Sequence, residues 1–296
     1  MTPLTASPTR RDVIRLLGLA SLGAAPAFSA AKLKIGHTGI TWGNDSEQAI
    51  KDIAGLGFYG FETFGNVLEA WEAKGGLERI LDAHKLPLIS AYCSCNLVEP
   101  AKRKEELEKM ARWAALIQKC GGTVSVIGPN SIKREGYDFK ANRDNIIVSL
   151  NEVAKMLTDK GLVPVLHQHT GTCIETRDEV YAVLDAVDSH YLKFGPDVGQ
   201  LAKGGSDPVQ VVKDYLPLVR HMHLKDYSGG DAFLGYCPLG QGKVHIPAIL
   251  EMLEKANSQL TVMVELDPSP GMPMTPLETA EISKKYLKKL GYGFRA

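Results

Sequence analysis

The sequence has no excess of charge of either sign and no long hydrophobic run. Its 296 residues contain 34 Lys and Arg against 34 Asp and Glu, so the formal net charge at pH 7 is zero. Proteins that bind nucleic acids usually carry a basic excess or a basic stripe, and neither is present here. The apolar run near the N-terminus is shorter than the about 20 residues that a transmembrane helix needs. The composition therefore argues against a nucleic-acid partner and against a transmembrane helix at the N-terminus.

Cysteine is scarce, and several common catalytic motifs are missing. None of the five cysteines has the spacing of a zinc-binding motif, and we interpret them as free thiols in the core: Cys93, Cys95, Cys120, Cys173 and Cys237. The chain has no P-loop and no Gly-x-Ser-x-Gly elbow. The GHTG stretch at 36–39 is not the Gly-rich turn that binds dinucleotides. These absences disfavour phosphate-loop enzymes, serine hydrolases and Rossmann dehydrogenases.

The N-terminal residues 1–31 have the pattern of an export signal. Arg10 and Arg11 precede an apolar run rich in Leu, Ala and Gly, and small residues follow at 27–31. This order resembles a twin-arginine signal peptide, although Arg15 stands where Lys is usual. The resemblance implies delivery to the periplasm by the twin-arginine export machinery. The alternative is a basic leader on a cytoplasmic enzyme.

Cleavage is expected after Ser29 or Ala31, and it leaves a mature domain of residues 32–296. About 265 residues are enough to bury the core of one large α/β domain.

Short apolar stretches alternate with amphipathic patterns along this domain. The stretches that predict strands lie at 33–42, 59–64, 86–94, 123–128, 163–170, 191–197, 219–226 and 260–267. Helical patterns follow them at 46–56, 77–84, 102–119, 143–160, 176–186, 208–216, 247–255 and 276–289. Such alternation is typical of parallel strands joined by helices. Eight units predict a single (β/α)8 TIM barrel, and the alternative is an open, doubly wound sheet, which usually has fewer strands.

Polar side chains gather where the predicted strands end, which is where barrel enzymes place their active sites. These side chains are His37, Trp42, Glu62, His167, His169, Asp197, His221, His223, Lys225, Asp226, Glu265 and Asp267. Alternate residues of a strand share a face, so His167 is expected to point the same way as His169. Each residue alone is more often structural than functional. Because buried ionisable groups are unfavourable unless they are paired or bind a metal, their convergence predicts an active site.

Several motifs, in order, resemble the xylose isomerase-like barrel superfamily of sugar isomerases, epimerases and dehydratases, and most closely its inosose dehydratase-type members. They are GITWGNDSEQAIKDIAGLGFYGFET, HQHTGTCIET, FGPDVGQLAKGGSDP, VRHMHLKD, PLGQGKVHIPAIL and MVELD. One departure is Gln200, which stands where that family usually has His. The resemblance covers essentially the whole mature chain and implies a metal-dependent sugar or cyclitol enzyme.

The resemblance also implies a metal site with one ligand from each of the last four strands. Carried over by position, the ligands are His167, Asp197, His223 and Glu265. A mixed set of imidazole and carboxylate suits Mn2+ best, with Mg2+, Co2+, Zn2+ and Fe2+ as alternatives. No thiolate is in the set, which argues against a structural zinc site.

The first of these ligands distinguishes between reaction types. Many epimerases of the superfamily carry Glu where His167 stands, and they use two facing glutamates to remove and return a proton. With His167 that pair is broken. We therefore expect one-way removal of a proton next to a carbonyl through a metal-stabilised enediolate, as in a lyase or dehydratase. A sugar isomerase or epimerase is the alternative.

The remaining roles follow from the chemistry of the side chains around this site. His169 is expected to act as acid or base beside the metal, and the roles of His167 and His169 could be exchanged. Glu265 is the alternative base, and Lys225 would stabilise negative charge or protonate the leaving oxygen. Glu62 is a further candidate catalytic residue. Contacts to the substrate are expected from His37, Trp42, Glu62 and Lys225.

The expected substrate is a small sugar or cyclitol. Export favours oxidised sugars or 3-keto-glycosides outside the inner membrane, and no nucleic-acid partner is expected. Two rival functions are a metal-dependent endonuclease, known in one branch of the superfamily, and a non-catalytic sugar-binding barrel. The sequence leaves the oligomeric state open, a homo-oligomer included.

Overall fold

Parallel strands form the centre of the structure, a computed structural model that describes residues 33–256 and 258–296. The eight strands are β1 (Lys34–Thr38), β2 (Phe61–Phe64), β3 (Leu88–Cys95), β4 (Val124–Pro129), β5 (Val163–Leu166), β6 (Lys193–Phe194), β7 (Met222–Leu224) and β10 (Thr261–Val264). They form one sheet in the order β6-β5-β4-β3-β2-β1-β10-β7, and every pair in it is parallel.

The two outer strands of this sheet, β6 and β7, also meet each other. Parallel bridges join Phe194 to Val219 and Asp197 to His223. The His223 amide donates a hydrogen bond to the Pro196 carbonyl oxygen at 2.9 Å. The sheet is therefore closed, which confirms the predicted (β/α)8 barrel.

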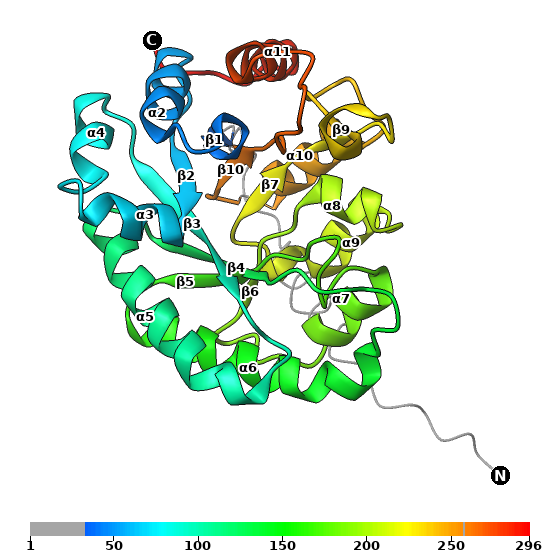
Figure 1. Cartoon of the computed structure of the whole chain (residues 1–296). Helices are drawn as coiled ribbons and strands as arrows, with labels where there is room; N and C mark the ends of the chain where they lie inside the picture. Colours follow the sequence, from blue (N-terminus) through cyan, green and yellow to red (C-terminus); the bar gives the residue numbers. More distant parts are fainter. Residues whose placement is uncertain (1–32, 257) are drawn as a thin grey trace, which may run out of the picture.

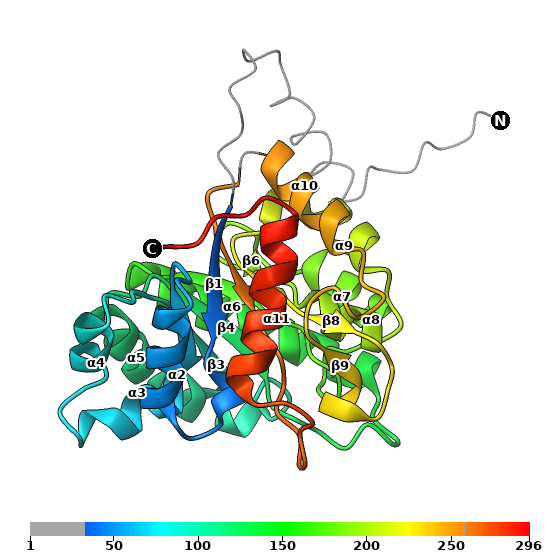
Figure 2. The same cartoon turned by 90° about the horizontal axis from the view of Figure 1, so that it is seen from above.

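Helices surround the strands (Figures 1 and 2). They are α2 (Ser46–Gly55), α3 (Gly65–Glu72), α4 (Glu78–Ala83), α5 (Arg103–Lys119), α6 (Phe139–Asp159), α7 (Arg177–Leu184), α8 (Val198–Lys203), α9 (Pro208–Tyr215), α10 (Ile246–Lys255) and α11 (Pro276–Lys289). Short 3-10 turns lie at η1 (Ile40–Trp42), η2 (Pro100–Lys102), η3 (Leu216–Leu218) and η4 (Ala232–Gly235). The sequence patterns did not predict α3, α8 or the antiparallel hairpin of β8 (Asp226–Tyr227) and β9 (Tyr236–Cys237).

Local sequence explains where the helices begin and which face they bury. In α5 the buried side chains Met110, Trp113, Ala114 and Ile117 recur at the spacing of one helix face. A capping box starts α7 at Thr176, where the hydroxyl accepts from the Glu179 amide and the Glu179 carboxylate accepts from the Thr176 amide. The apolar faces pack against the outside of the barrel and leave the polar strand ends for the site.

The predictions about cysteines and export have different outcomes. All five cysteines carry free thiols; Cys120 is half-buried, and the other four are buried, as a core role requires. Among the described residues, no helix combines the length and the apolar character needed to cross a membrane. The predicted signal at 1–31 lies outside the described residues.

Candidate active site

Strand β7 brings three ionisable side chains into the barrel. His221, His223 and Lys225 alternate with apolar residues, and each is at most 1 % exposed. Because alternate residues of a strand share a face, all three belong to the inner face that the sequence predicted. Burial of this kind requires compensating charges from the facing strands.

His223 lies between carboxylates at both ring nitrogens. Its Nδ1 is 3.0 Å from Glu265 Oε2 and 4.0 Å from Asp197 Oδ2, and its Nε2 is 2.7 Å from Glu62 Oε1. Burial would lower the pKa of His223, but Glu265 and Glu62 outweigh it and hold this pKa well above its usual value. These contacts are short, yet they lack the alignment of hydrogen bonds. The ring is therefore held mainly by charge.

His167 follows β5 and has a buried nitrogen without a partner. Its ring centroid is 4.7 Å from that of His223 and 5.3 Å from that of Tyr92. Its Nδ1 accepts and donates no hydrogen bond. Burial and the neighbouring His223 hold the pKa of His167 well below its usual value, so the ring is neutral. One ligand atom from each of His167, Asp197 and His223 lies within 4.8 Å of the others, as a metal site requires.

Asp197 begins α8 and contributes one oxygen to this group. Its Oδ1 accepts a hydrogen bond from the Gln200 amide at 2.8 Å, which caps the helix. Its Oδ2 has no aligned hydrogen bond and lies 3.0 Å from Lys225 Nζ. Burial raises the pKa of Asp197 in spite of Lys225. The helix cap thus fixes the carboxylate and leaves its second oxygen facing the site.

Lys225 is surrounded by three carboxylates and is fully buried. Its Nζ lies 3.0 Å from Asp197, 2.7 Å from Glu265 and 2.9 Å from Asp267. Burial would lower the pKa of Lys225, but these carboxylates raise it well above its usual value. A Cβ on Gly199 would lie 2.7 Å from Lys225 Cγ, so only glycine leaves room for this side chain. Lys225 is therefore an ammonium that neutralises two of the predicted ligands.

Glu62 joins the cluster from β2. One oxygen lies 2.7 Å from His223 Nε2, and the other lies 2.8 Å from His221 Nε2 and accepts from the Ser90 hydroxyl. Burial would raise the pKa of Glu62, but His223 and His221 outweigh it and lower this pKa to about 2. Glu62, His221 and His223 form a second group whose ligand atoms converge. The predicted substrate contact is thus a carboxylate that is only 2 % exposed.

His169 lies in the loop after β5 and has partners at both ring nitrogens. Its Nδ1 is 2.6 Å from the Thr170 carbonyl oxygen, so Nδ1 carries the proton. Its Nε2 is 2.7 Å from the side-chain nitrogen of Gln200, which therefore donates. Gln200 Oε1 accepts from the Thr170 hydroxyl at 2.7 Å, which fixes the orientation of the amide. Gln200, which stands where the family usually has His, thus helps to orient the His169 ring.

His37 and Trp42, two predicted substrate contacts, pack against each other at 5.4 Å between ring centroids. The buried His37 donates through Nδ1 to the Thr38 carbonyl oxygen at 2.7 Å, and burial lowers its pKa to about 4. Trp42 is half-buried, and its Nε1 donates to Asp52 at 2.8 Å. Both side chains are therefore anchored at the end of β1.

Two further residues have roles that the sequence did not assign. Asp226 accepts hydrogen bonds from the amides of Gly240, Gly242 and Val244, and thereby holds the loop after β9. Tyr236, from the unpredicted hairpin, places its ring 4.7 Å from Lys225 Nζ. No pattern indicated Tyr236, because its place in the site depends on the hairpin.

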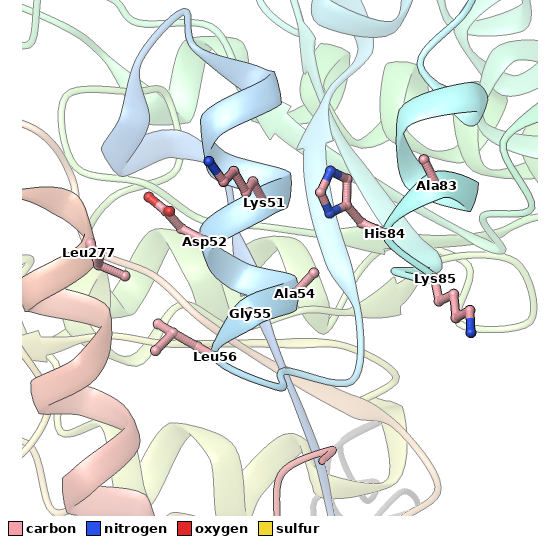
Figure 3. Close-up of a pocket in the computed structure, with 9 residues that line it drawn as sticks. All are labelled: Lys51, Asp52, Ala54, Gly55, Leu56, Ala83, His84, Lys85 and Leu277. Carbon is pink, nitrogen blue, oxygen red and sulfur yellow. The ribbon is translucent and has the colours of Figure 1, made fainter.

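A surface hollow of about 610 Å³ lies elsewhere, between α2, α4 and α11. Figure 3 shows Lys51 and Asp52 on α2, His84 at the end of α4 and Leu277 on α11. Its lining includes cations, one carboxylate and aliphatic side chains. Within the described part of the chain, the groups with converging ligand atoms lie at the barrel histidines instead. We therefore take the barrel interior as the candidate active site.

Comparison with known proteins agrees with this fold. The profile of the xylose isomerase-like TIM barrel family matches residues 50–290, and the chain belongs to that family. An inosose dehydratase of Clostridium botulinum (strain Alaska E43 / Type E3) is 26 % identical over 298 residues, which cover 88 % of this chain and 98 % of the relative.

Two solved structures share the fold. The 3-keto-D-glucoside 4-epimerase YcjR of E. coli superposes with a TM-score of 0.68 at 18 % identity, covering 88 % of this chain and 99 % of that one. The IOLI protein with a bound zinc atom superposes with a TM-score of 0.72 at 15 % identity, covering 87 % and 98 %. The protein is an enzyme of this superfamily.

Proposed function

We propose that the protein is a divalent-metal-dependent enzyme that removes a proton next to a carbonyl of a sugar or cyclitol and acts as a lyase or dehydratase of a keto-sugar or 3-keto-glycoside. The observation that carries this proposal is the convergence of His167, Asp197 and His223 inside the barrel. The dehydratase relative and the 3-keto-glucoside epimerase with the same fold support a carbonyl-bearing sugar or cyclitol.

The residues present fit a divalent ion. The buried Nδ1 of His167 has no partner, and a buried polar atom without a partner is unfavourable by about 1–3 kcal/mol. His167, Asp197, His223 and Glu265 would hold the ion, and their mixed donors favour Mn2+ over the alternatives Mg2+, Co2+, Zn2+ and Fe2+. When bound, it would supply positive charge beside the substrate carbonyl.

The chain's own groups account for the proton movements. In an elimination, the C–H bond next to the carbonyl and the C–O bond one carbon further break, and a C=C bond forms. His169 would take the proton at Nε2 once that nitrogen leaves Gln200, with Glu265 as the alternative base. Lys225 would donate a proton to the leaving oxygen or stabilise its charge. His37 and Trp42 would contact the sugar.

The choice of lyase over epimerase rests on His167. A symmetric pair of carboxylates could exchange one proton between the two faces of a carbon, whereas this site has imidazole on the β5 side. An epimerase or isomerase is the second candidate. A metal-dependent endonuclease or a non-catalytic sugar barrel would lack turnover of any keto-sugar.

The proposal is tested by screening inososes, keto-sugars and 3-keto-glycosides with metal-free protein and added Mn2+. We expect a new C=C absorbance or release of the leaving alcohol only with metal present. A product that differs from its substrate only in configuration would replace the lyase with the epimerase. Binding of these compounds without any turnover would contradict both.

We also propose that the protein is exported, because its N-terminal pattern is that of a twin-arginine signal. Replacing Arg10→Lys together with Arg11→Lys should leave the protein in the cytoplasm. Cell fractionation with the unchanged chain as control measures this. Unchanged periplasmic delivery of the double variant would refute the signal.

A further inference from the structure

Glu62 occupies a central position among three strands. In the parallel pairing of β2 with β3, Glu62 lies opposite Ser90, and the Ser90 hydroxyl donates to Glu62 Oε2. Across the barrel interior, the same carboxylate reaches His221 and His223 of β7. The side chains of Glu62, His221 and His223 are each at most 2 % exposed. One buried carboxylate therefore connects β2, β3 and β7.

The two nitrogens of His223 belong to different halves of the cluster. Nδ1 faces Glu265 and Asp197, and Nε2 faces Glu62 at 2.7 Å. An imidazole that binds a metal through one nitrogen carries its proton on the other, and that proton usually points to a carboxylate or carbonyl. With Nδ1 toward the ion, the proton would lie on Nε2, where Glu62 is the nearest acceptor.

We infer that Glu62 is a positioning residue, which accepts the Nε2 proton of His223 and so presents Nδ1 of that ring to the metal site. The inference rests on the metal site proposed above. The Ser90 hydroxyl donates to the other oxygen of Glu62, and His221 Nε2 lies 2.8 Å from that oxygen, so both neighbours favour the orientation toward His223. This role replaces the substrate contact expected of Glu62 from the sequence.

Contact with a substrate hydroxyl fits Glu62 poorly. Both carboxylate oxygens already have partners, and the residue is 2 % exposed. A hydroxyl would need to displace His221 or His223, and either change would remove a charge contact that helps to stabilise the buried carboxylate. A partner that orients a ligand needs no access to solvent.

The experiment measures Zn2+ affinity of the full chain, with zinc chosen because it is diamagnetic. Glu62→Gln keeps the shape but removes the charge, and we expect its affinity to fall by about 10- to 100-fold. Glu62→Asp keeps the charge and should recover part of this loss. Glu106→Gln is the matched control, because Glu106 is also a buried carboxylate but contacts the Asn96 amide and Lys109 instead of the histidines. Its zinc affinity should stay within about threefold of wild type.

A second measurement starts from the wild-type protein. Proton–nitrogen correlation spectra of the zinc-loaded protein with 15N-labelled histidine should show His223 bound through Nδ1 and protonated at Nε2. Binding through Nε2 would overturn the inference. In Glu62→Gln we expect the Nε2 proton signal of the folded protein to shift, which a loss of overall stability alone would not produce.

Other outcomes separate the rival roles. Equal zinc affinity in wild type and Glu62→Gln would overturn the positioning role. A wild type that binds two zinc ions, one of which is lost in Glu62→Gln, would show that Glu62, His221 and His223 are a cation site themselves. A raised KM with unchanged zinc affinity would restore the substrate contact. Absence of zinc binding to the wild type would instead refute the metal site of the proposed function.

Discussion

His167 and His169 lie two residues apart after the same strand, but their surroundings differ. His167 is buried among His223, Tyr92 and Asp197, and its Nδ1 has no partner. His169 is half-buried, and both its nitrogens have partners within the loop and on Gln200. His167 therefore has a ring nitrogen that is free to bind a ligand. In His169 both ring nitrogens already form hydrogen bonds within the protein.

This difference shows that the spacing of residues places side chains but does not set their chemistry. A buried nitrogen without a partner is a rare and unfavourable state, which a ligand can relieve. A satisfied imidazole must first exchange a hydrogen bond before it reacts. The comparison therefore supports His167 as the ligand and makes the acid–base role of His169 conditional on release of Gln200.

The largest effect is expected from His167→Ala. It removes one of the four proposed ligands, so divalent-metal affinity should fall by more than the about 10- to 100-fold that is typical when a residue that only orients a ligand is lost. Turnover should be lost with the metal. Metal titration by calorimetry and an activity assay measure the two losses on one preparation, and His190→Ala, a histidine outside the barrel interior, is the control. Full metal affinity in His167→Ala would show that His167 is not a metal ligand.

A smaller loss is expected from His169→Ala. The metal should remain bound within about threefold, and kcat should fall by about 10² to 10⁴ if His169 is the acid or base. Gln200→Met removes the amide that donates to His169 Nε2, and it should keep turnover within about tenfold of wild type because that nitrogen becomes free. Loss of metal from His169→Ala would exchange the roles of the two histidines. Unchanged turnover would make His169 structural.

Much of the fold could be predicted from the sequence, because each strand and helix has its own local pattern. The strand ends were less predictable: the stretch 191–197 forms a ladder only at Lys193–Phe194, since Asp197 already caps α8. The β8–β9 hairpin was missed because its strands are two residues long and are separated by glycine-rich turns. Such elements depend on tertiary contacts rather than on periodicity.

That the side chains of the site lie close together could be predicted, but their individual contacts could not. Strand periodicity and family motifs brought His223 and Lys225 into one cluster with the carboxylates of the neighbouring strands. The sequence could not reveal that Glu62 lies against His221 and His223 or that Gln200 supports His169. Those contacts join residues at least 30 positions apart, and only the packed barrel determines them.

The next prediction concerns the proton that His223 must release when the metal binds. In the metal-free protein, His223 is charged because Glu265 and Glu62 outweigh burial and raise its pKa well above 6.5. This charge stabilises the metal-free fold below the unfolded pKa, and the stabilisation is lost as the pH rises through the folded pKa. A metal must displace that proton, so affinity should rise by about tenfold per pH unit until the raised pKa is passed.

Calorimetry in two buffers of different ionisation enthalpy measures this release. Wild type and His169→Ala should release the same number of protons, because His169 is not among the ligands. A pH-independent affinity would mean that His223 is neutral before binding or does not bind the metal. Fewer protons released by His169→Ala would place that residue in the coordination sphere.

The smallest effect is expected from Thr170→Val, which tests the hydrogen bonds around His169. The Thr170 hydroxyl donates to Gln200 Oε1 at 2.7 Å, and this bond helps to hold the amide against His169. Valine keeps the shape but leaves one acceptor without this donor, so the free energy of unfolding should fall by about 1 kcal/mol. Metal affinity should not change, because Thr170 touches no proposed ligand except through the loop. Urea unfolding with and without Mn2+ measures both quantities. If metal affinity falls together with stability, the loop around Thr170 also holds the metal ligands in place.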